Sequence, residues 1–401
     1  MNSMKSFLAV GLCVSVLGRL AVFGQEPSGE WGKPWQYSLR MGGEFSDNRD
    51  GTATNKQNNL DGIVEPRAEF IWQDADRTRM QLMVMPQMRW HSHPRTAAEG
   101  SAQDSTELFG ACGLELMHRL TPTLTLNAGD QFSYSDDPAK IETGTTSRRR
   151  ESYVRNDAHA GVNAAVSAAA GANLTAGVVT MRYPDSDAAR ELDSDLYNVA
   201  CSPYYNMGSG WMVLGNVGAS EFQSEKTIRM RGSAMETCYA GVEKKVTQDF
   251  VWKVLGGYQF VQYDNPALKS DNMLGGNAEV VFMETAPTRF RLGVEYGYTP
   301  PSIGGYSAQQ ATTYSGAVDH DVLANRMTIS LQGQYRDSQY LSEGADAPSG
   351  SEKMTRLGIH GTYFLNNKWS FTGGYFYENW ESLLREPFQR NLITASVRAA
   401  W

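Results

Sequence analysis

The stretch NLITASVRAAW, residues 391–401, alternates between apolar and polar side chains and ends on a tryptophan. Ile393 and Val397 fall on one side of an extended chain, and Thr394 and Arg398 fall on the other, because successive side chains of a strand point to opposite faces. Chain ends usually fray into solvent. A terminus with this pattern therefore predicts that the last residues are paired in a sheet.

The same alternation recurs outward from this stretch, back to residue 35. Short turns and long polar loops separate runs of about nine to thirteen residues, which is enough to cross a bilayer at a tilt. Counting the runs predicts about eighteen strands, with about sixteen as the alternative; both fit the even strand numbers and unequal loops of bacterial outer-membrane barrels. We therefore predict an all-β fold over residues 35–401. It is a single transmembrane antiparallel up-and-down β-barrel with short periplasmic turns and long extracellular loops.

The composition is compatible with such a barrel although it resembles that of a soluble acidic protein. The chain has 401 residues, a formal net charge of −8 and a mean hydropathy of −0.44. A membrane barrel places its apolar residues at every second position, so its average stays polar. The mature chain lacks the apolar run of about twenty residues that a membrane helix needs. Its mild acidity disfavours a nucleic-acid partner, and we predict none.

Residues 1–24 predict a secretory signal peptide. Lys5 supplies the positive start, residues 7–17 form the apolar segment, and Val22 and Gly24 are small enough for cleavage. An internal membrane anchor is the alternative for this segment. Residues 25–34 would then be a periplasmic N-terminal segment. We expect export to the outer membrane of a Gram-negative-type bacterium.

Cysteine and histidine spacing gives no metal or disulfide framework. The three cysteines of the mature chain, Cys112, Cys201 and Cys238, are far apart. The first two fall on apolar strand faces and are predicted to be small hydrophobic residues. His91 and His93 bracket a serine at a strand end but have no companion carboxylate nearby in the sequence. We expect no metal and no cofactor.

The chain contains no convincing motif of a hydrolase nucleophile, a zinc protease or a phosphate loop. A barrel hydrolase could still assemble a serine, a histidine and an acid from different strands. We nevertheless predict that the protein is not an enzyme.

Large aromatic residues bound the apolar rows at both strand ends. Such belts are expected where amphipathic rings lie at the two headgroup levels, so the apolar face is predicted to contact lipid. The alternative is an ordinary sandwich with its apolar face inward. The predicted membrane-interface residues are Trp35, Trp72, Trp90, Trp211, Trp252, Tyr298, Tyr335, Trp369 and Trp401.

The opposite face carries charge repeatedly and would then surround the interior. A barrel of about eighteen strands is wide enough for an aqueous lumen. These charges could screen solutes, or they could only brace the wall as ion pairs, and both roles stay open. The predicted pore-lining residues are Arg40, Glu44, Glu65, Arg67, Glu69, Arg79, Arg89, Glu115, Lys253, Glu295, Arg356, His360 and Arg398.

The run Arg148–Arg150 lies in the longest predicted loop. It could fold inward and attract anions, or bind surface polysaccharide, because long loops often carry function. A solvated loop tip is the alternative.

The last third of the chain resembles the putative beta-barrel porin 2 type of outer-membrane barrel. The residues that carry the resemblance are RMTISLQGQYRDSQY (326–340), GIHGTYFLNNKWSFTGGYFYENWES (358–382) and FQRNLITASVRAAW (388–401). The resemblance implies a porin or an outer-membrane component of polysaccharide export, and it brings no catalytic residues. The terminal aromatic also resembles the signal that barrels present to the barrel-assembly machinery.

The predicted function is passive passage of hydrophilic solutes through an outer-membrane channel. The alternatives are an outer-membrane component of polysaccharide export and a surface-exposed structural or adhesive barrel. Predicted partners are outer-membrane lipid, lipopolysaccharide, the barrel-assembly machinery, and either hydrophilic solutes or polysaccharide. The oligomeric state and the identity of the solute stay open.

Overall fold

A computed structural model describes residues 34–48, 56, 58–74, 77–92, 106–135, 153–183, 193–224, 232–264, 266, 269–282, 287–299, 306–323, 326–342, 350–383 and 387–401. The strands are β1 Trp35–Ser46, β2 Asn59–Asp74, β3 Thr78–His91, β4 Thr106–Thr121, β5 Leu124–Ser135, β6 Tyr153–Ala165, β7 Ala170–Arg182, β8 Ser194–Gly208, β9 Trp211–Ser224, β10 Ser233–Lys245, β11 Phe250–Tyr263, β12 Asp271–Phe282, β13 Thr288–Thr299, β14 Tyr306–Val322, β15 Met327–Ser342, β16 Gly350–Phe364, β17 Trp369–Ser382 and β18 Phe388–Ala400. Among the described residues no helix is long and apolar enough to span a membrane.

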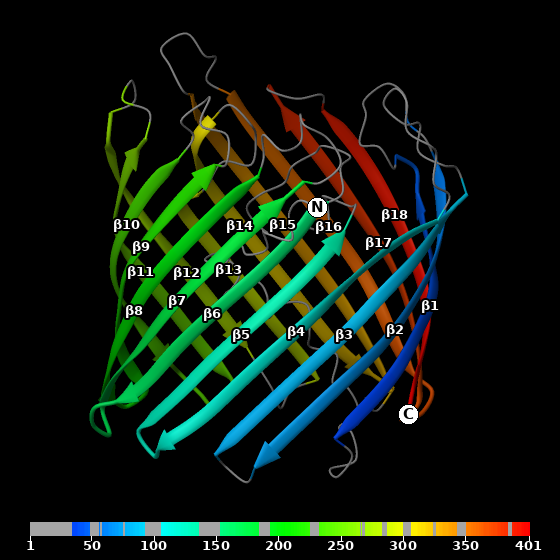
Figure 1. Cartoon of the computed structure of the whole chain (residues 1–401), viewed down its shortest axis with the longest axis horizontal. Coiled ribbons are helices and arrows are strands. Elements are labelled where there is room, and N and C mark those ends of the chain that lie inside the picture. The colour runs from blue at the N-terminus through cyan, green and yellow to red at the C-terminus, as the bar shows by residue number, and fades with distance from the viewer. Residues whose placement is uncertain are drawn as a thin grey trace, which may run out of the picture.

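These strands form one closed antiparallel barrel (Figure 1). Each strand pairs with its neighbours in the sequence, and β1 pairs with both β2 and β18. The sheet has 18 strands, which confirms the predicted barrel and decides against sixteen. A sandwich is excluded because all strands belong to a single sheet that closes on itself.

The seam between β1 and β18 ties down the C-terminus. The Trp401 amide donates to the Tyr37 carbonyl at 3.0 Å, and the Tyr37 amide donates to the Trp401 carbonyl at 3.2 Å. Gly42 permits the close approach of the two strands, since a Cβ there would lie 2.5 Å from the Ala395 carbonyl oxygen. The predicted pairing of the last residues is confirmed.

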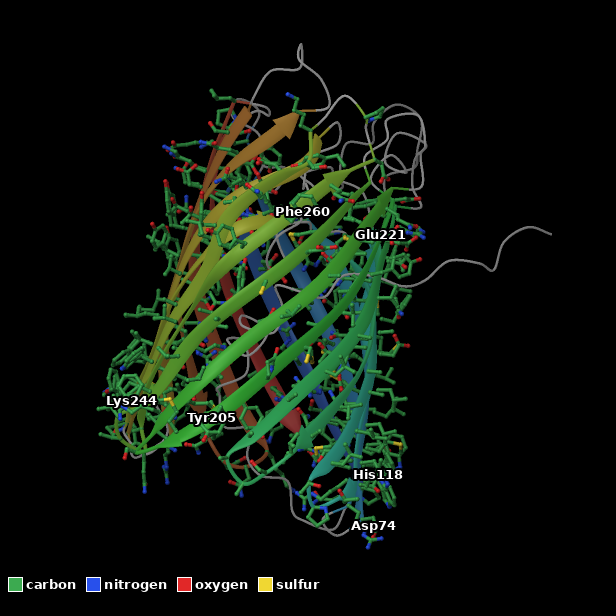
Figure 2. The ribbon with its side chains drawn as sticks, turned by 90° about the vertical axis from the view of Figure 1, so that its left-hand side faces the viewer. Asp74, His118, Tyr205, Glu221, Lys244 and Phe260 are labelled. Carbon is green, nitrogen blue, oxygen red and sulfur yellow. The ribbon has the colours of Figure 1, made fainter. Side chains whose placement is uncertain are left out.

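The two ends of the barrel differ. Short turns join strands at one end, called the turn end, which carries Asp74, His118, Tyr205 and Lys244 (Figure 2). Glu221 and Phe260 lie toward the opposite end, called the loop end (Figure 2). The turn between β16 and β17 shows the local chemistry of the short connections. The Asn366 side-chain oxygen accepts hydrogen bonds from the Lys368 and Trp369 amides, at 2.8 and 3.0 Å.

The two faces of the sheet differ in chemistry, as the alternation predicts. On the face that includes Met41, Val84, Leu114, Val217 and Leu331, large apolar side chains are exposed. That face is the outside of the barrel, and the residues between them point inward. Four predictions concern residues outside the described part: the signal peptide of residues 1–24, the periplasmic segment of residues 25–34 except its last residue, the histidine at position 93 and the arginine run at 148–150.

Candidate functional site: the barrel interior

The pairing registers place every predicted pore-lining residue on the inner face. In β1 and β2, Arg40 lies opposite Glu65, and Glu44 lies opposite Asp61. The others follow the same alternation through β2, β3, β4, β11, β13, β16 and β18; they are Arg67, Glu69, Arg79, Arg89, Glu115, Lys253, Glu295, Arg356, His360 and Arg398. These registers give the positions of the residues, and their role in solute passage stays a prediction.

A buried charge cluster joins the first three strands near the loop end. Arg89 Nη1 lies 3.3 Å from Asp61 Oδ2 and 3.5 Å from Glu44 Oε1. His91 Nδ1 lies 2.7 Å from Asp61 Oδ1. All four side chains are buried, so this cluster links strands and leaves little charge exposed. Glu44 and Arg89 were predicted to line the pore, whereas Asp61, which follows a polar loop, was not.

A second buried cluster joins β16, β17 and β18. Glu378 lies opposite Arg356 on one side and Arg390 on the other. Its carboxylate accepts from Arg390 Nη2 at 2.6 Å and lies 3.2 Å from Arg356 Nε. Only Arg356 of this trio was predicted, because Glu378 and Arg390 lie at strand ends beside a loop. Both unpredicted residues are buried.

The wall of β1 to β3 carries more accessible pairs. Arg40 donates to both oxygens of Glu65, at 3.0 and 2.7 Å, and its side chain is 42% exposed. Arg67 lies 2.9 Å from Glu69, whose other oxygen accepts from Gln81 at 2.5 Å. These pairs form a band of alternating charge along the inner wall.

Glu115 and His159 form an exposed acid–histidine pair on the inner face of the described strands. Their side chains are 58% and 39% exposed, and Glu115 Oε2 lies 3.6 Å from His159 Nε2. Gly129 on the strand between them lets the two side chains meet, because a Cβ there would lie 2.4 Å from the imidazole and 2.5 Å from the carboxylate. A charge at position 115 therefore faces the interior.

The remaining predicted residues lie apart from one another on the inner face. Arg79 donates to Gln81 at 3.4 Å, and Lys253 lies opposite Glu279 in the ladder. The His360 ring stacks on Phe376 with centroids 6.4 Å apart. Glu295 lies on β13, and Arg398 lies opposite Arg40 across the seam.

Buried apolar clusters also line the inner face toward the loop end, which the alternation alone does not predict. The first includes Val179, Met181, Leu196 and Phe222. A further one contains Met354, Trp380 and Phe388. The sequence does contain a sign of these clusters, because large apolar residues occupy positions on the otherwise polar face where strands end beside the loops.

Tyr298 differs from the other predicted interface aromatics because its side chain is buried. It is 5% exposed and packs against inward-facing Val261, with Met235, Tyr263 and Met273 around it. The alternation placed it outward. Its pairing with β14 continues opposite Gln310, but the ladder between β12 and β13 ends at Tyr296, and beyond that point the Tyr298 ring packs with inward-facing residues.

The other predicted interface aromatics keep the outward register. Trp211 and Trp252 meet edge to face with centroids 5.6 Å apart, and Lys244 Nζ lies 4.7 Å from the centre of the Trp211 ring. The remaining members of the set, all exposed, are Trp35, Trp72, Trp90, Tyr335, Trp369 and Trp401. Their contact with lipid headgroups stays a prediction.

Charged residues also lie on the outer face. Asp130 lies outward between Leu114 and Ala158. Nearer the loop end, Arg182 donates to both oxygens of Asp195 at 3.0 and 2.8 Å.

Within the described residues no group of three or more histidine, cysteine, aspartate or glutamate side chains could hold a metal.

Comparison with known proteins points to one family. The family model described as Putative beta-barrel porin 2 matches residues 39–401. No curated protein matches the chain. Among solved structures, OpdK of Pseudomonas aeruginosa with vanillate has a TM-score of 0.52 and 10% identity, covering 92% of this chain and 99% of its own.

Two further crystal structures are similar in fold. OccAB4 of Acinetobacter baumannii has a TM-score of 0.50 and 12% identity, covering 92% of this chain and 98% of its own. A BenF-like porin from Pseudomonas fluorescens Pf-5 has the same TM-score and identity, covering 92% and 99%. At such identities these likenesses establish a shared barrel fold.

Proposed function

Since the chain belongs to the putative beta-barrel porin 2 family, we propose that its barrel is a passive, water-filled outer-membrane channel for hydrophilic solutes. The single observation that carries the proposal is the inner face, where exposed Arg40, Glu115 and His159 lie among ion pairs. A closed barrel of 18 strands is in the size range that leaves an aqueous passage. Passage through such a lumen needs no covalent chemistry, and we propose no catalytic residue.

The proposed pore lining has two parts. The buried clusters around Asp61 and Glu378 brace the wall near the loop end, because their charges are already paired and desolvated. The exposed side chains at positions 40, 115 and 159 face water, and the charges of Arg40 and Glu115 screen solutes. Arginine and acid alternate around this lining, so we expect weak ion selectivity.

Reconstitution tests the channel directly. The purified, folded protein is expected to give conductance steps in planar bilayers and to let small sugars swell liposomes. Heat-modifiable migration on gels reports folding in the same preparation. A pure and folded protein that stays closed in both assays would contradict the proposal.

A charge reversal tests which residues face the permeating ions. Glu115→Lys is expected to shift the cation-to-anion permeability ratio by about twofold toward anions, because a lumen charge acts within a Debye length of passing ions. The matched control is Glu221→Lys, since Glu221 is exposed on the outer face. Reversal potentials in a KCl gradient measure both. Equal shifts in the two variants would place the lining elsewhere.

The route to the membrane follows from the N-terminal sequence. We propose that residues 1–24 are removed as a signal peptide and that residues 25–34 lie in the periplasm. The C-terminal strand is proposed to engage the barrel-assembly machinery, and the outer face to contact lipid and lipopolysaccharide. Mass spectrometry of the outer-membrane protein is expected to find an N-terminus at Gln25.

A further inference from the structure

The wall between β12 and β13 is incompletely paired. The two strands pair from Phe282 opposite Phe290 only as far as Gly276 opposite Tyr296. On their other sides both strands stay paired beyond that point, β12 with β11 to residue 271 and β13 with β14 to residue 299. Residues 271–275 and 297–299 therefore border a gap in the ladder, on the loop side of Gly276.

A glutamine from a third strand occupies this gap. Gln259 of β11 is buried, and its Oε1 accepts a hydrogen bond from the Tyr298 amide at 2.7 Å. Gly275 and Gly297 make room for it, because a Cβ on them would lie 2.9 and 2.5 Å from that oxygen. A side chain thus replaces the backbone partner that a continuous ladder would supply.

The Tyr298 side chain closes the gap from within. It packs on Val261 and is surrounded by Met235 and Met273, and its hydroxyl donates to the Asp271 carboxylate across the two strands. Side-chain contacts can rearrange without unzipping a strand, whereas a paired seam opens only by breaking successive backbone hydrogen bonds. Here the wall can open by moving side chains alone, without breaking backbone hydrogen bonds between β12 and β13.

Apolar surface lies on both sides of the gap. Inside is the cluster around Tyr298. Outside, Tyr258 is 65% and Leu274 62% exposed, with exposed Tyr296 at the last pair. Phe260, the next outward residue of β11, lies toward the loop end (Figure 2). Apolar side chains therefore lie beside the gap on both faces of the wall.

We propose that the barrel opens laterally between β12 and β13 and passes small amphiphiles between its interior and the outer leaflet, with Tyr298 as the gate. The solute needs an apolar body and a hydroxyl or amine, because the acceptor that Tyr298 releases on moving is the Asp271 carboxylate. This route is separate from axial passage of hydrophilic solutes and does not depend on it.

Photolabelling tests the lateral route on the intact protein. The probe is a medium-chain alcohol bearing a diazirine, incorporated into the lipid of proteoliposomes and activated by light. Mass spectrometry then locates the label. Entry through the gap is expected to label Met235 and Met273 above Met354, Trp380 and Phe388, which form an inner cluster on β16, β17 and β18.

Variants at the gate sharpen the test. Tyr298→Ala is expected to increase the label on Met235 and Met273 severalfold, and Tyr298→Phe to increase it less, because the ring remains while its hydrogen bond to Asp271 is lost. Tyr314→Ala is the matched control, since Tyr314 is exposed on the outer face of β14 and is paired with Val294 and Tyr335 on its two sides. It is expected to leave the inner label unchanged.

Two results would overturn the lateral route. One is label confined to outward residues such as Tyr258 and Leu274 in both the wild type and Tyr298→Ala. The other is equal label on both inner clusters, which would indicate axial entry. Sugar-driven liposome swelling in the same preparations reports axial passage independently. Failure of the lateral route is therefore distinguished from failure of axial passage.

Discussion

Replacing Glu378 with alanine is expected to destabilise the barrel by about 3–5 kcal/mol, the usual loss when one partner of a buried ion pair is removed. Glu378 lies between Arg356 and Arg390 and is bonded to Arg390 at 2.6 Å. Removing its carboxylate leaves two guanidinium groups on the inner wall without their shared acceptor. Urea unfolding in lipid vesicles, followed by heat-modifiable migration, measures the loss.

The matched control is Glu381→Ala, three positions along the same strand. Glu381 is exposed on the outer face near the loop end and accepts from Asn379 at 3.2 Å. Its replacement is expected to change stability by no more than about 0.5 kcal/mol, as at most surface positions. If the two variants unfold at the same urea concentration, the cluster does not brace the wall.

Val397→Arg is expected to cost about 2–4 kcal/mol of folding free energy in a bilayer, the range for a cation on the lipid face near mid-membrane. Val397 points outward from β18, between Met41 and Phe371 in the neighbouring strands. Because β18 also closes the barrel, a misplaced strand there opens the seam. Folding yield into vesicles and urea unfolding both report the effect.

Thr394→Arg tests the opposite face of the same strand. Thr394 points inward and lies opposite Glu44 across the seam. A guanidinium there meets water and carboxylates rather than lipid, so we expect a much smaller loss. Equal losses from the two arginines would mean that the faces do not differ in environment.

Much of the fold was predictable from local alternation. The period of two in residues 391–401 identified the last strand, and the same period elsewhere gave the strand number and the division into inner and outer faces. Alternation is a property of a single strand, which a sequence records directly. Closure followed because every strand of a membrane sheet needs a partner on both edges.

Alternation within one strand could not predict which side chain on a neighbouring strand each charged residue would contact. Arg356 was selected as a single charge, but its sharing of Glu378 with Arg390 depends on the register of three strands. The early end of the ladder between β12 and β13, beyond which the Tyr298 ring packs with inward-facing residues, is likewise a property of two strands together. Charges at strand ends beside loops were also missed, as with Asp61.

The central claim is that charged side chains surround water while apolar ones face lipid, and a cysteine scan of residues 330–335 in β15 tests it most directly. Single cysteines replace each residue in turn in a background with Cys112, Cys201 and Cys238 changed to alanine. Ser330, Gln332 and Gln334 point inward, and Leu331, Gly333 and Tyr335 point outward. In proteoliposomes, a charged thiol reagent is expected to react at positions 332 and 334, to react more slowly at position 330, where Ser330 is buried, and to spare the other three. Reaction at the odd positions, or at all six without alternation, would contradict the account.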